Sequence, residues 1–298
     1  MGPAVHATPN ASLYAVASRD QERSATLEPQ VVHRSYQDLI DDPLVDAVYI
    51  SLTNAQHKEW VLAALNAGKH VLCEKPLAMN ASEVGTMLDA ATRNKCLLVE
   101  AVWTRWQPRM QRMAQIVKSG ELGEVTGISS AFTFQGDLTN NYRLDPSFGG
   151  GALLDVGVYQ AHLWLMLLNE DVSFSIESVE RTMGATGVDL TTRAQLQLNN
   201  SVAAQLLASF DMPAQQRIEV TGTTATMRTG EGEAFTLWKQ PSTLLIGETV
   251  EHFEADDAFA LMVHGVSTAI EAKESTIFPA ASSLCAAEIA DAIARFNN

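Results

Sequence analysis

Short apolar runs alternate with helix-like segments over the first hundred residues of the chain. The runs are bounded by polar loops and lack the in-out alternation of a half-exposed strand. They cover residues 13–18, 31–32, 45–50, 69–73 and 96–99. Strands that are apolar on both faces and separated by helices predict a parallel, doubly wound sheet covered by helices on both sides.

Local capping residues place the helices between these strands. Asp20 and Ser35 each precede a short helix, and either Asn80 or Ser82 begins a longer one that ends near residue 93. A helix over residues 59–67 is expected to end at Gly68, because glycine readily adopts the left-handed conformation that closes a helix.

The pattern changes after Glu100. Residues 125–134 alternate as a strand, and residues 174–253 contain short strands about eight to ten residues apart, with turn signals between them, which predicts a large antiparallel sheet. The remaining helices are expected over residues 107–118, 152–168, 258–273 and 281–296. We therefore expect two domains: residues 1–101, a Rossmann-like parallel sheet, and residues 102–298, an α+β domain.

Polar side chains follow four of the predicted parallel strands. Because the carboxyl ends of parallel strands lie at one edge of a sheet, these loops are expected to converge on a single crevice that suits a nucleotide-like ligand. The residues concerned are Ser18 and Arg19, Thr53 and Asn54, Glu74 and Lys75, and Glu100.

Composition narrows the possible partners. The chain has 298 residues and a formal net charge of −15, which argues against general nucleic-acid binding and against adhesion to an anionic membrane. No apolar run is long enough to cross a bilayer, and the N-terminus has no signal-peptide pattern. The three cysteines are scattered and show no disulfide or metal-type spacing, so a reducing, cytoplasmic location and no metal ion are expected.

One expected motif is missing from the start of the chain. A dinucleotide-binding sheet normally begins with a strand that runs into G-x-G-x-x-G, whose glycines let backbone N–H groups approach the pyrophosphate. No such motif precedes Leu13, so the strand at 13–18 corresponds to the second strand of such a unit. Either the chain is truncated, or it does not hold the pyrophosphate in the usual way.

Lys75, Asp155 and Tyr159 are candidates for acid–base chemistry. An ammonium near a phenol favours the phenolate and lowers the pKa of the tyrosine. Asp155 and Tyr159 are four residues apart on a predicted helix and share one face, although such a pair also occurs as a cap and a packing residue. His162 is expected to be a partly buried helix residue rather than a metal ligand.

Two further positions have open interpretations. Trp103 and Trp106 flank Arg105 in an aromatic–basic cluster that could line a site or pack at a domain junction. His57, near the start of a predicted helix, could reach the crevice or cap the helix.

The chain resembles the glucose–fructose oxidoreductase / inositol dehydrogenase (Gfo/Idh/MocA) family. The resemblance is carried by residues 17–19 (ASR), 46–50 (DAVYI), 54–57 (NAQH), 67–76 (AGKHVLCEKP) and 149–159 (GGGALLDVGVY). Residues 99–105 (VEAVWTR) and a tyrosine at 159 are most similar to the branch of dimeric dihydrodiol dehydrogenases and NADP-dependent D-xylose dehydrogenases.

The resemblance implies a role for each matching residue. Lys75 and Tyr159 would form the acid–base pair, with Asp155 positioning the substrate or the pair. Trp103 and Arg105 would lie at the substrate, and Trp103 would also line the nicotinamide site. The cofactor-binding residues would be Ser18, Arg19, Thr53, Asn54, His57, Glu74, Lys75 and Trp103.

The cofactor implied by the resemblance is NADP rather than NAD. Arg19 follows the second strand, where an arginine pairs with a 2′-phosphate and an acidic residue would favour NAD. The antiparallel sheet would form a homodimer through its open face. Since the glycine-rich turn is absent, we expect this chain, as written, to bind NADP poorly.

Three functions are compatible with the sequence. The first is an NAD(P)-dependent oxidoreductase that transfers a hydride between a secondary or anomeric hydroxyl of a sugar or trans-dihydrodiol and the nicotinamide. The second is a non-catalytic sugar- or nucleotide-sensing protein on the same fold. The third, a structural oligomerisation module, leaves the converging polar loops unexplained.

Overall fold

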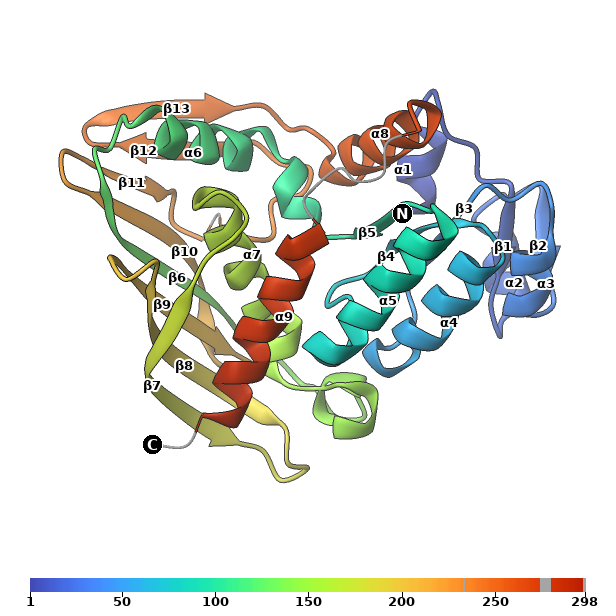
Figure 1. The fold of residues 1–298 in the computed structure, drawn as a ribbon, viewed down its shortest axis with the longest axis horizontal. Coiled ribbons are helices and arrows are strands. Elements are labelled where there is room, and N and C mark those ends of the chain that lie inside the picture. Colours follow the sequence, from blue (N-terminus) through green and yellow to red (C-terminus); the bar gives the residue numbers. More distant parts are fainter. Residues whose placement is uncertain (233, 274–279, 297–298) are drawn as a thin grey trace.

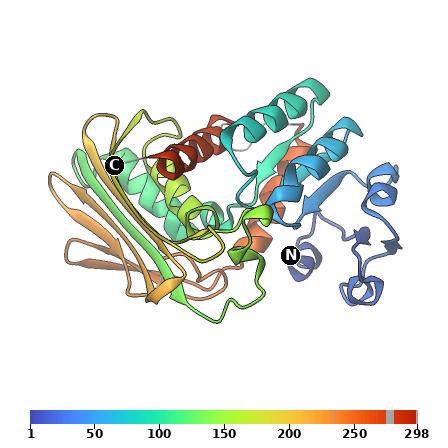
Figure 2. The same cartoon turned by 90° about the horizontal axis from the view of Figure 1, so that it is seen from below.

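The computed structural model describes residues 1–232, 234–273 and 280–296. Figure 1 shows a large, strongly twisted sheet at one end of the molecule and a group of short strands with their helices at the other. In the orthogonal view of Figure 2, the N-terminal elements again lie at the end opposite the large sheet.

The first hundred residues alternate between strands and helices, as the sequence predicts. The elements are α1 (Gly2–His6), β1 (Ala15–Ala17), α2 (Gln21–Ala25), β2 (Val31–His33), α3 (Tyr36–Asp41), β3 (Ala47–Ile50), α4 (Asn54–Asn66), β4 (His70–Cys73), α5 (Ala81–Asn94) and β5 (Leu98–Glu100). Asp20, Ser35 and Asn80 cap α2, α3 and α5 by accepting backbone N–H groups. These starts could be predicted because a cap depends only on nearby residues.

Helix α4 begins five residues before its predicted start. Its first turn contains polar residues, but two of them are held by distant parts of the chain: Asn54 bonds the carbonyl oxygen of Gly149, and His57 bonds that of Pro76. These contacts support a helical turn that the hydrophobic period does not mark.

The parallel strands form two separate sheets. Strands β1 and β2 pair with each other, and β3, β4 and β5 form a second sheet in the order β3-β4-β5. In the usual doubly wound order, the first strand lies between the second and the fourth, which correspond here to β1 and β3. Among the described residues no strand takes that place, so β1 and β3 each keep one unpaired edge.

The second half of the chain builds the large sheet and its helices. After a 3₁₀ turn (Trp103–Trp106) it contains α6 (Pro108–Ser119), β6 (Val125–Gln135), α7 (Val158–Leu167), β7 (Phe174–Met183), β8 (Asp189–Leu198), β9 (Val202–Ser209), β10 (Asp211–Gly222), β11 (Thr226–Thr229), β12 (Ser242–Ile246), β13 (Thr249–Phe253), α8 (Ala258–Glu271) and α9 (Ala280–Arg295).

The large sheet has eight strands in the order β13-β12-β11-β10-β6-β9-β8-β7. It is antiparallel except for one pair, since β6 and β9 run parallel. The sequence pattern predicts an antiparallel sheet throughout. The difference arises because α7 and the β7–β8 hairpin lie between β6 and β9, which gives the crossover length that a parallel pair requires.

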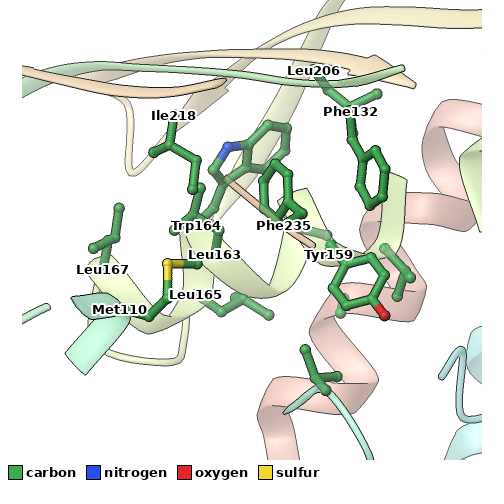
Figure 3. Packing of buried hydrophobic residues seen from close by; sticks show 14 of the residues in the cluster. Met110, Phe132, Tyr159, Leu163, Trp164, Leu165, Leu167, Leu206, Ile218 and Phe235 are labelled. Atoms are coloured by element: carbon green, nitrogen blue, oxygen red, sulfur yellow. The ribbon is translucent and has the colours of Figure 1, made fainter. Parts of the chain in front are cut away.

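One face of this sheet is buried and the other is open. Along β9, Val202, Ala204 and Leu206 are buried, whereas Ala203 and Gln205 are exposed. Helix α7 covers the buried face, where Trp164 packs among side chains of the strands and of α6 (Figure 3). Helix α9 packs against both α7 and α5 and so joins the two halves of the chain.

The helix that carries Asp155 and Tyr159 begins irregularly. Residues Leu153–Gly157 form a wider π-helical turn that continues directly into α7. Such turns are frequent at functional sites. No helix in the described part of the chain is both long and apolar enough to span a membrane.

Candidate active site

A cavity of about 680 Å³ lies at the carboxyl ends of β1, β3 and β4. Its wall includes Arg19 after β1, Thr53 and Asn54 after β3, and Glu74 and Lys75 after β4. The predicted convergence of these loops is therefore present. The fourth predicted loop is different, because Glu100 is buried and does not line the cavity.

Lys75 and Asp155 are in direct contact. The Lys75 Nζ donates to the backbone oxygen of Asp155 at 2.7 Å and to its Oδ1 at 2.8 Å. The other carboxylate oxygen, Oδ2, accepts the Nε–H of Arg143 at 2.6 Å. Asp155 is therefore a carboxylate fixed between two cations, and Lys75 joins the strand end of one domain to the helix of the other.

Tyr159 lies beside this group. The Lys75 Nζ is 5.0 Å from the centroid of the Tyr159 ring, and the Tyr159 hydroxyl oxygen accepts the Trp103 Nε1–H at 3.0 Å. The ring packs against Phe132 and Phe235, and Figure 3 shows its hydroxyl on the side away from them. Both the lysine charge and the tryptophan N–H favour a phenolate at this position.

Burial and charge act in opposite directions on these groups. Burial raises the pKa of Tyr159 more than Lys75 lowers it, so the net shift is upward and the phenol is protonated near neutral pH. Burial alone would lower the pKa of Lys75, but Tyr159 and Asp155 raise it above its usual value. Burial would raise the pKa of Asp155, yet Lys75 and Arg143 together lower it.

Trp103 and Arg105 are more buried than a substrate-lining role would suggest. Trp103 stacks on Phe259, and its one N–H is directed to Tyr159. The Arg105 guanidinium forms an ion pair with Glu170, and the side chain is only 4% exposed. Trp103 therefore contacts the candidate acid–base residue, whereas Arg105 pairs with Glu170 and neither of these two residues lines the cavity.

The residues near α2 form a basic end of the cavity. Arg19 and Arg23 both line it, together with Tyr36. The Ser18 hydroxyl instead bonds the backbone of Asp20 and the hydroxyl of Ser24, which fixes the turn into α2. Two guanidinium groups at one end provide the local positive charge that an anionic ligand would need against a net charge of −15.

His57 is fully buried and does not line the cavity. Its Nδ1 lies 2.9 Å from the carbonyl oxygen of Pro76, and its Nε2 lies 3.1 Å from that of Leu52. His57 therefore ties the loop after β3 to the loop that contains Lys75. Of the two roles that the sequence allows for His57, reaching the crevice or capping the helix, the contacts favour a supporting role.

Two site residues make contacts that we did not predict from the sequence. Arg143 holds Asp155, and Tyr49 on β3 donates its hydroxyl to Glu74. A basic residue in the polar loop before the glycine run was a usable signal for Arg143. No signal marked Tyr49, which reads as an ordinary strand residue.

The glycine run at 149–151 begins the segment that carries Asp155. Gly149 has φ +77°, and a Cβ there would lie 2.8 Å from the Cβ of Asn54. Gly151 has φ +118°, and its Cβ would lie 2.2 Å from the Oδ1 of Asp189. Side chains are excluded at both positions, because both the backbone conformation and the neighbouring atoms require glycine.

This arrangement suits acid–base chemistry on a hydroxyl or carbonyl group. It also fits the two ends of a dinucleotide: arginines at one end of the cavity and the Lys75 group at the other. No glycine is among the described residues that line the cavity. In the described part of the chain no three His, Cys, Asp or Glu side chains are placed to hold a metal ion.

Comparison with known proteins gives consistent results for both halves of the chain. Residues 1–102 match the model of the oxidoreductase family with an NAD-binding Rossmann fold, and residues 110–228 match the GFO/IDH/MocA C-terminal domain.

Similar proteins include dehydrogenases and a reductase. D-xylose 1-dehydrogenase (NADP(+)) 2 of Haloferax volcanii is 32% identical over 284 residues, which is 92% of this chain and 85% of that protein. Trans-1,2-dihydrobenzene-1,2-diol dehydrogenase of Mus musculus is 33% identical over 80% of this chain and 70% of its own length. The structure of a 3-ketoreductase from Actinomadura kijaniata in complex with NADP and TDP-benzene aligns with a TM-score of 0.89 and 27% identity, covering 98% of this chain and 92% of that one.

Proposed function

Because the chain belongs to the GFO/IDH/MocA oxidoreductase family, we propose that it is an NADP-dependent dehydrogenase acting on a secondary or anomeric hydroxyl of a sugar or trans-dihydrodiol. The observation that carries the proposal is the contact of Lys75, which lines the cavity, with both Asp155 and the ring of Tyr159. In this proposal residues 1–101 bind the cofactor, and residues 102–298 bind the substrate and form the dimer.

Tyr159 acts as the acid–base group. During oxidation its oxygen takes the proton of the substrate hydroxyl, and during reduction its hydroxyl returns a proton to the forming alkoxide. Lys75 and the Trp103 N–H stabilise the phenolate, while Asp155, fixed by Arg143, holds the lysine in place. Bound NADP supplies the hydride acceptor.

NADP is favoured over NAD by charge. Arg19 lies at the basic end of the cavity and pairs with a 2′-phosphate in this proposal. Two similar proteins support the same choice, since one carries NADP(+) in its name and the other was solved with NADP.

A screen for turnover tests the proposal. Aldoses and trans-dihydrodiols are offered with NADP, and keto sugars with NADPH, while NADPH absorbance is followed. Tyr159→Phe is expected to lower kcat by about 10²- to 10⁴-fold, the usual contribution of a positioned proton-transfer group. Unchanged kcat in Tyr159→Phe would remove Tyr159 from the mechanism, and no turnover of any substrate by a protein that binds NADP would contradict the dehydrogenase assignment.

A second candidate function is non-catalytic binding of a sugar or nucleotide. The observation in its favour is the break between β1 and β3, where the strand and glycine-rich turn that hold a pyrophosphate usually lie. The two candidates differ in the ligand that binds and in turnover.

We expect residues 1–298 to bind NADP weakly, because they lack the backbone N–H groups of that turn. Calorimetry would compare this polypeptide with a version carrying a strand and G-x-G-x-x-G turn ahead of Met1. The extended version should bind NADP more tightly by one to several orders of magnitude. A low-micromolar dissociation constant for residues 1–298 alone would show that this expectation is wrong.

A further inference from the structure

A buried carboxylate lies where the two halves of the molecule meet. Glu100 is the last residue of β5 and is 7% exposed. Its Oε1 accepts the backbone N–H of Leu77 at 2.9 Å, two residues after Lys75. Glu100 is thereby connected to the loop that carries the candidate lysine.

The other oxygen of Glu100 is directed to the helix of the second half. Its Oε2 lies 3.0 Å from the Nε2 of His162, which is 2% exposed and lies on α7, three residues after Tyr159. One carboxylate therefore contacts both the Lys75 loop and the Tyr159 helix. Neither Glu100 nor His162 lines the cavity, and neither takes part in the chemistry proposed above.

Glu100 is ionised despite its burial. Burial would raise the pKa of its carboxyl group, but His162, Ser283 and the Leu77 N–H lower it below its usual value. A buried carboxylate retains its charge only where donors of this kind surround it, so its position is determined by them.

We propose that Glu100 and His162 are a positioning pair that holds the Lys75 ammonium at a fixed place against the ring of Tyr159. The expected effect of this pair on kcat rests on the proposed function. Its structural effect does not: removal of the pair lets the Lys75 loop and α7 move relative to each other.

The expected signature is the titration of Tyr159. Four charged groups act on its phenol: the cations Lys75 and Arg143 favour the phenolate, whereas Glu74 and Asp155 raise the pKa. When Lys75 is displaced, the phenol should ionise at higher pH. Simple loss of the negative charge of Glu100 would have the opposite effect and move the ionisation to lower pH. The direction of the shift therefore separates positioning from a direct charge effect.

The experiment is a pH titration of tyrosinate absorbance in the ligand-free protein. For each variant, the curve of the same variant with Tyr159→Phe added is subtracted, so that the signal of Tyr159 alone remains. Glu100→Leu removes the acceptor for Leu77, and His162→Leu removes the contact with Glu100. Both should move the Tyr159 midpoint to higher pH. Glu100→Gln keeps an oxygen for Leu77, and His162→Gln keeps a polar side chain beside Glu100, so neither should raise the midpoint.

Two controls keep the result interpretable. Leu167→Ala, at the far end of α7, removes buried atoms without touching the pair and should leave the Tyr159 midpoint unchanged. If a single leucine variant does not fold, the double variant Glu100→Leu/His162→Leu is titrated instead, because replacement of both members of a buried pair by apolar groups is often tolerated.

Folded leucine variants whose Tyr159 midpoint is unchanged or lowered would overturn the proposal. A raised midpoint supports it, as does a kcat lower by about 10- to 100-fold with KM unchanged, the loss expected from misplaced catalytic groups. The titration needs neither substrate nor cofactor, so its result is independent of turnover. If the midpoint is raised but no substrate is turned over, the missing turnover contradicts the dehydrogenase assignment and the raised midpoint still supports the positioning pair.

Discussion

The proposed chemistry depends on the phenol group of Tyr159. Burial raises its pKa, although the lysine beside it acts in the opposite direction. Oxidation of a hydroxyl requires the phenolate, which becomes populated as the pH rises. Reduction requires the protonated phenol, which is the form present near neutral pH. The two directions of the reaction should therefore differ in their pH dependence.

We predict that kcat/KM for oxidation rises with pH and that Lys75→Met moves this rise to still higher pH. The reason is that Lys75 lowers the pKa of Tyr159, so its removal makes the phenolate harder to form. The pH profile of each protein would be measured with one substrate. Lys118→Met, an exposed lysine on α6, is the matched control and should keep the original profile. A Lys75→Met profile that coincides with the parent's, or shifts to lower pH, would contradict this account.

The sequence identified the candidate triad but not the contacts that hold it. Lys75 could be found because a strand end followed by proline marks its place, and Asp155 and Tyr159 because helical spacing puts them on one face. The pairing of Arg143 with Asp155 joins two residues that are twelve positions apart and depends on how the segment between them folds back. The contact of His57 with Pro76 depends on a loop nineteen residues away in the sequence.

At the scale of elements, local signals were sufficient for most helices and insufficient for the sheets. Caps such as Asp20 and Ser35 bond residues within the same turn, so the sequence contains the whole interaction. Strand partners are chosen by tertiary packing. For this reason, neither the parallel pairing of β6 with β9 nor the separation of β1 from β3 into different sheets could be predicted from the sequence.

We predict that Gly151→Ala destabilises the protein and lowers kcat. An alanine there would adopt an unfavourable φ and clash with Asp189, which also accepts the N–H of Leu153 at the start of the Asp155 turn. The strain should cost about 1–3 kcal/mol of unfolding free energy. Urea unfolding measures the loss.

Gly85→Ala is the matched control for this prediction. Gly85 lies inside α5, and no atom lies within 4 Å of the added Cβ. Alanine should stabilise the helix there by about 0.5–1 kcal/mol. Equal changes in unfolding free energy for the two substitutions would mean that position 151 does not require glycine.

At the scale of the whole molecule, the open face of the eight-stranded sheet is the surface proposed for dimerisation. Ala203 and Gln205 on β9 are exposed near its centre, and Arg217 is exposed on β10. Ala203 and Gln205 are uncharged, so two such faces could approach closely at β9.

We predict a dimer in sedimentation experiments that Ala203→Lys converts to a monomer. A lysine on this face would place a second lysine close to it across a twofold axis, and the two like charges would repel each other. Gln115→Lys, on the exposed side of α6, should leave the dimer intact. A monomeric parent protein would exclude this interface, and a dimer that persists in Ala203→Lys would place it elsewhere.

The break in the parallel sheet also affects motion. Strands β1 and β2 have three residues each and form a sheet of only two strands, which is marginally stable by itself. We therefore expect residues 15–41 to open by local unfolding more readily than the sheet of β3, β4 and β5. Arg19 and Arg23 belong to this segment, while Lys75 belongs to the better supported sheet. A ligand that contacts both the two arginines and Lys75 has to order the segment as it binds. The loss of conformational entropy in this segment lowers the affinity for the ligand.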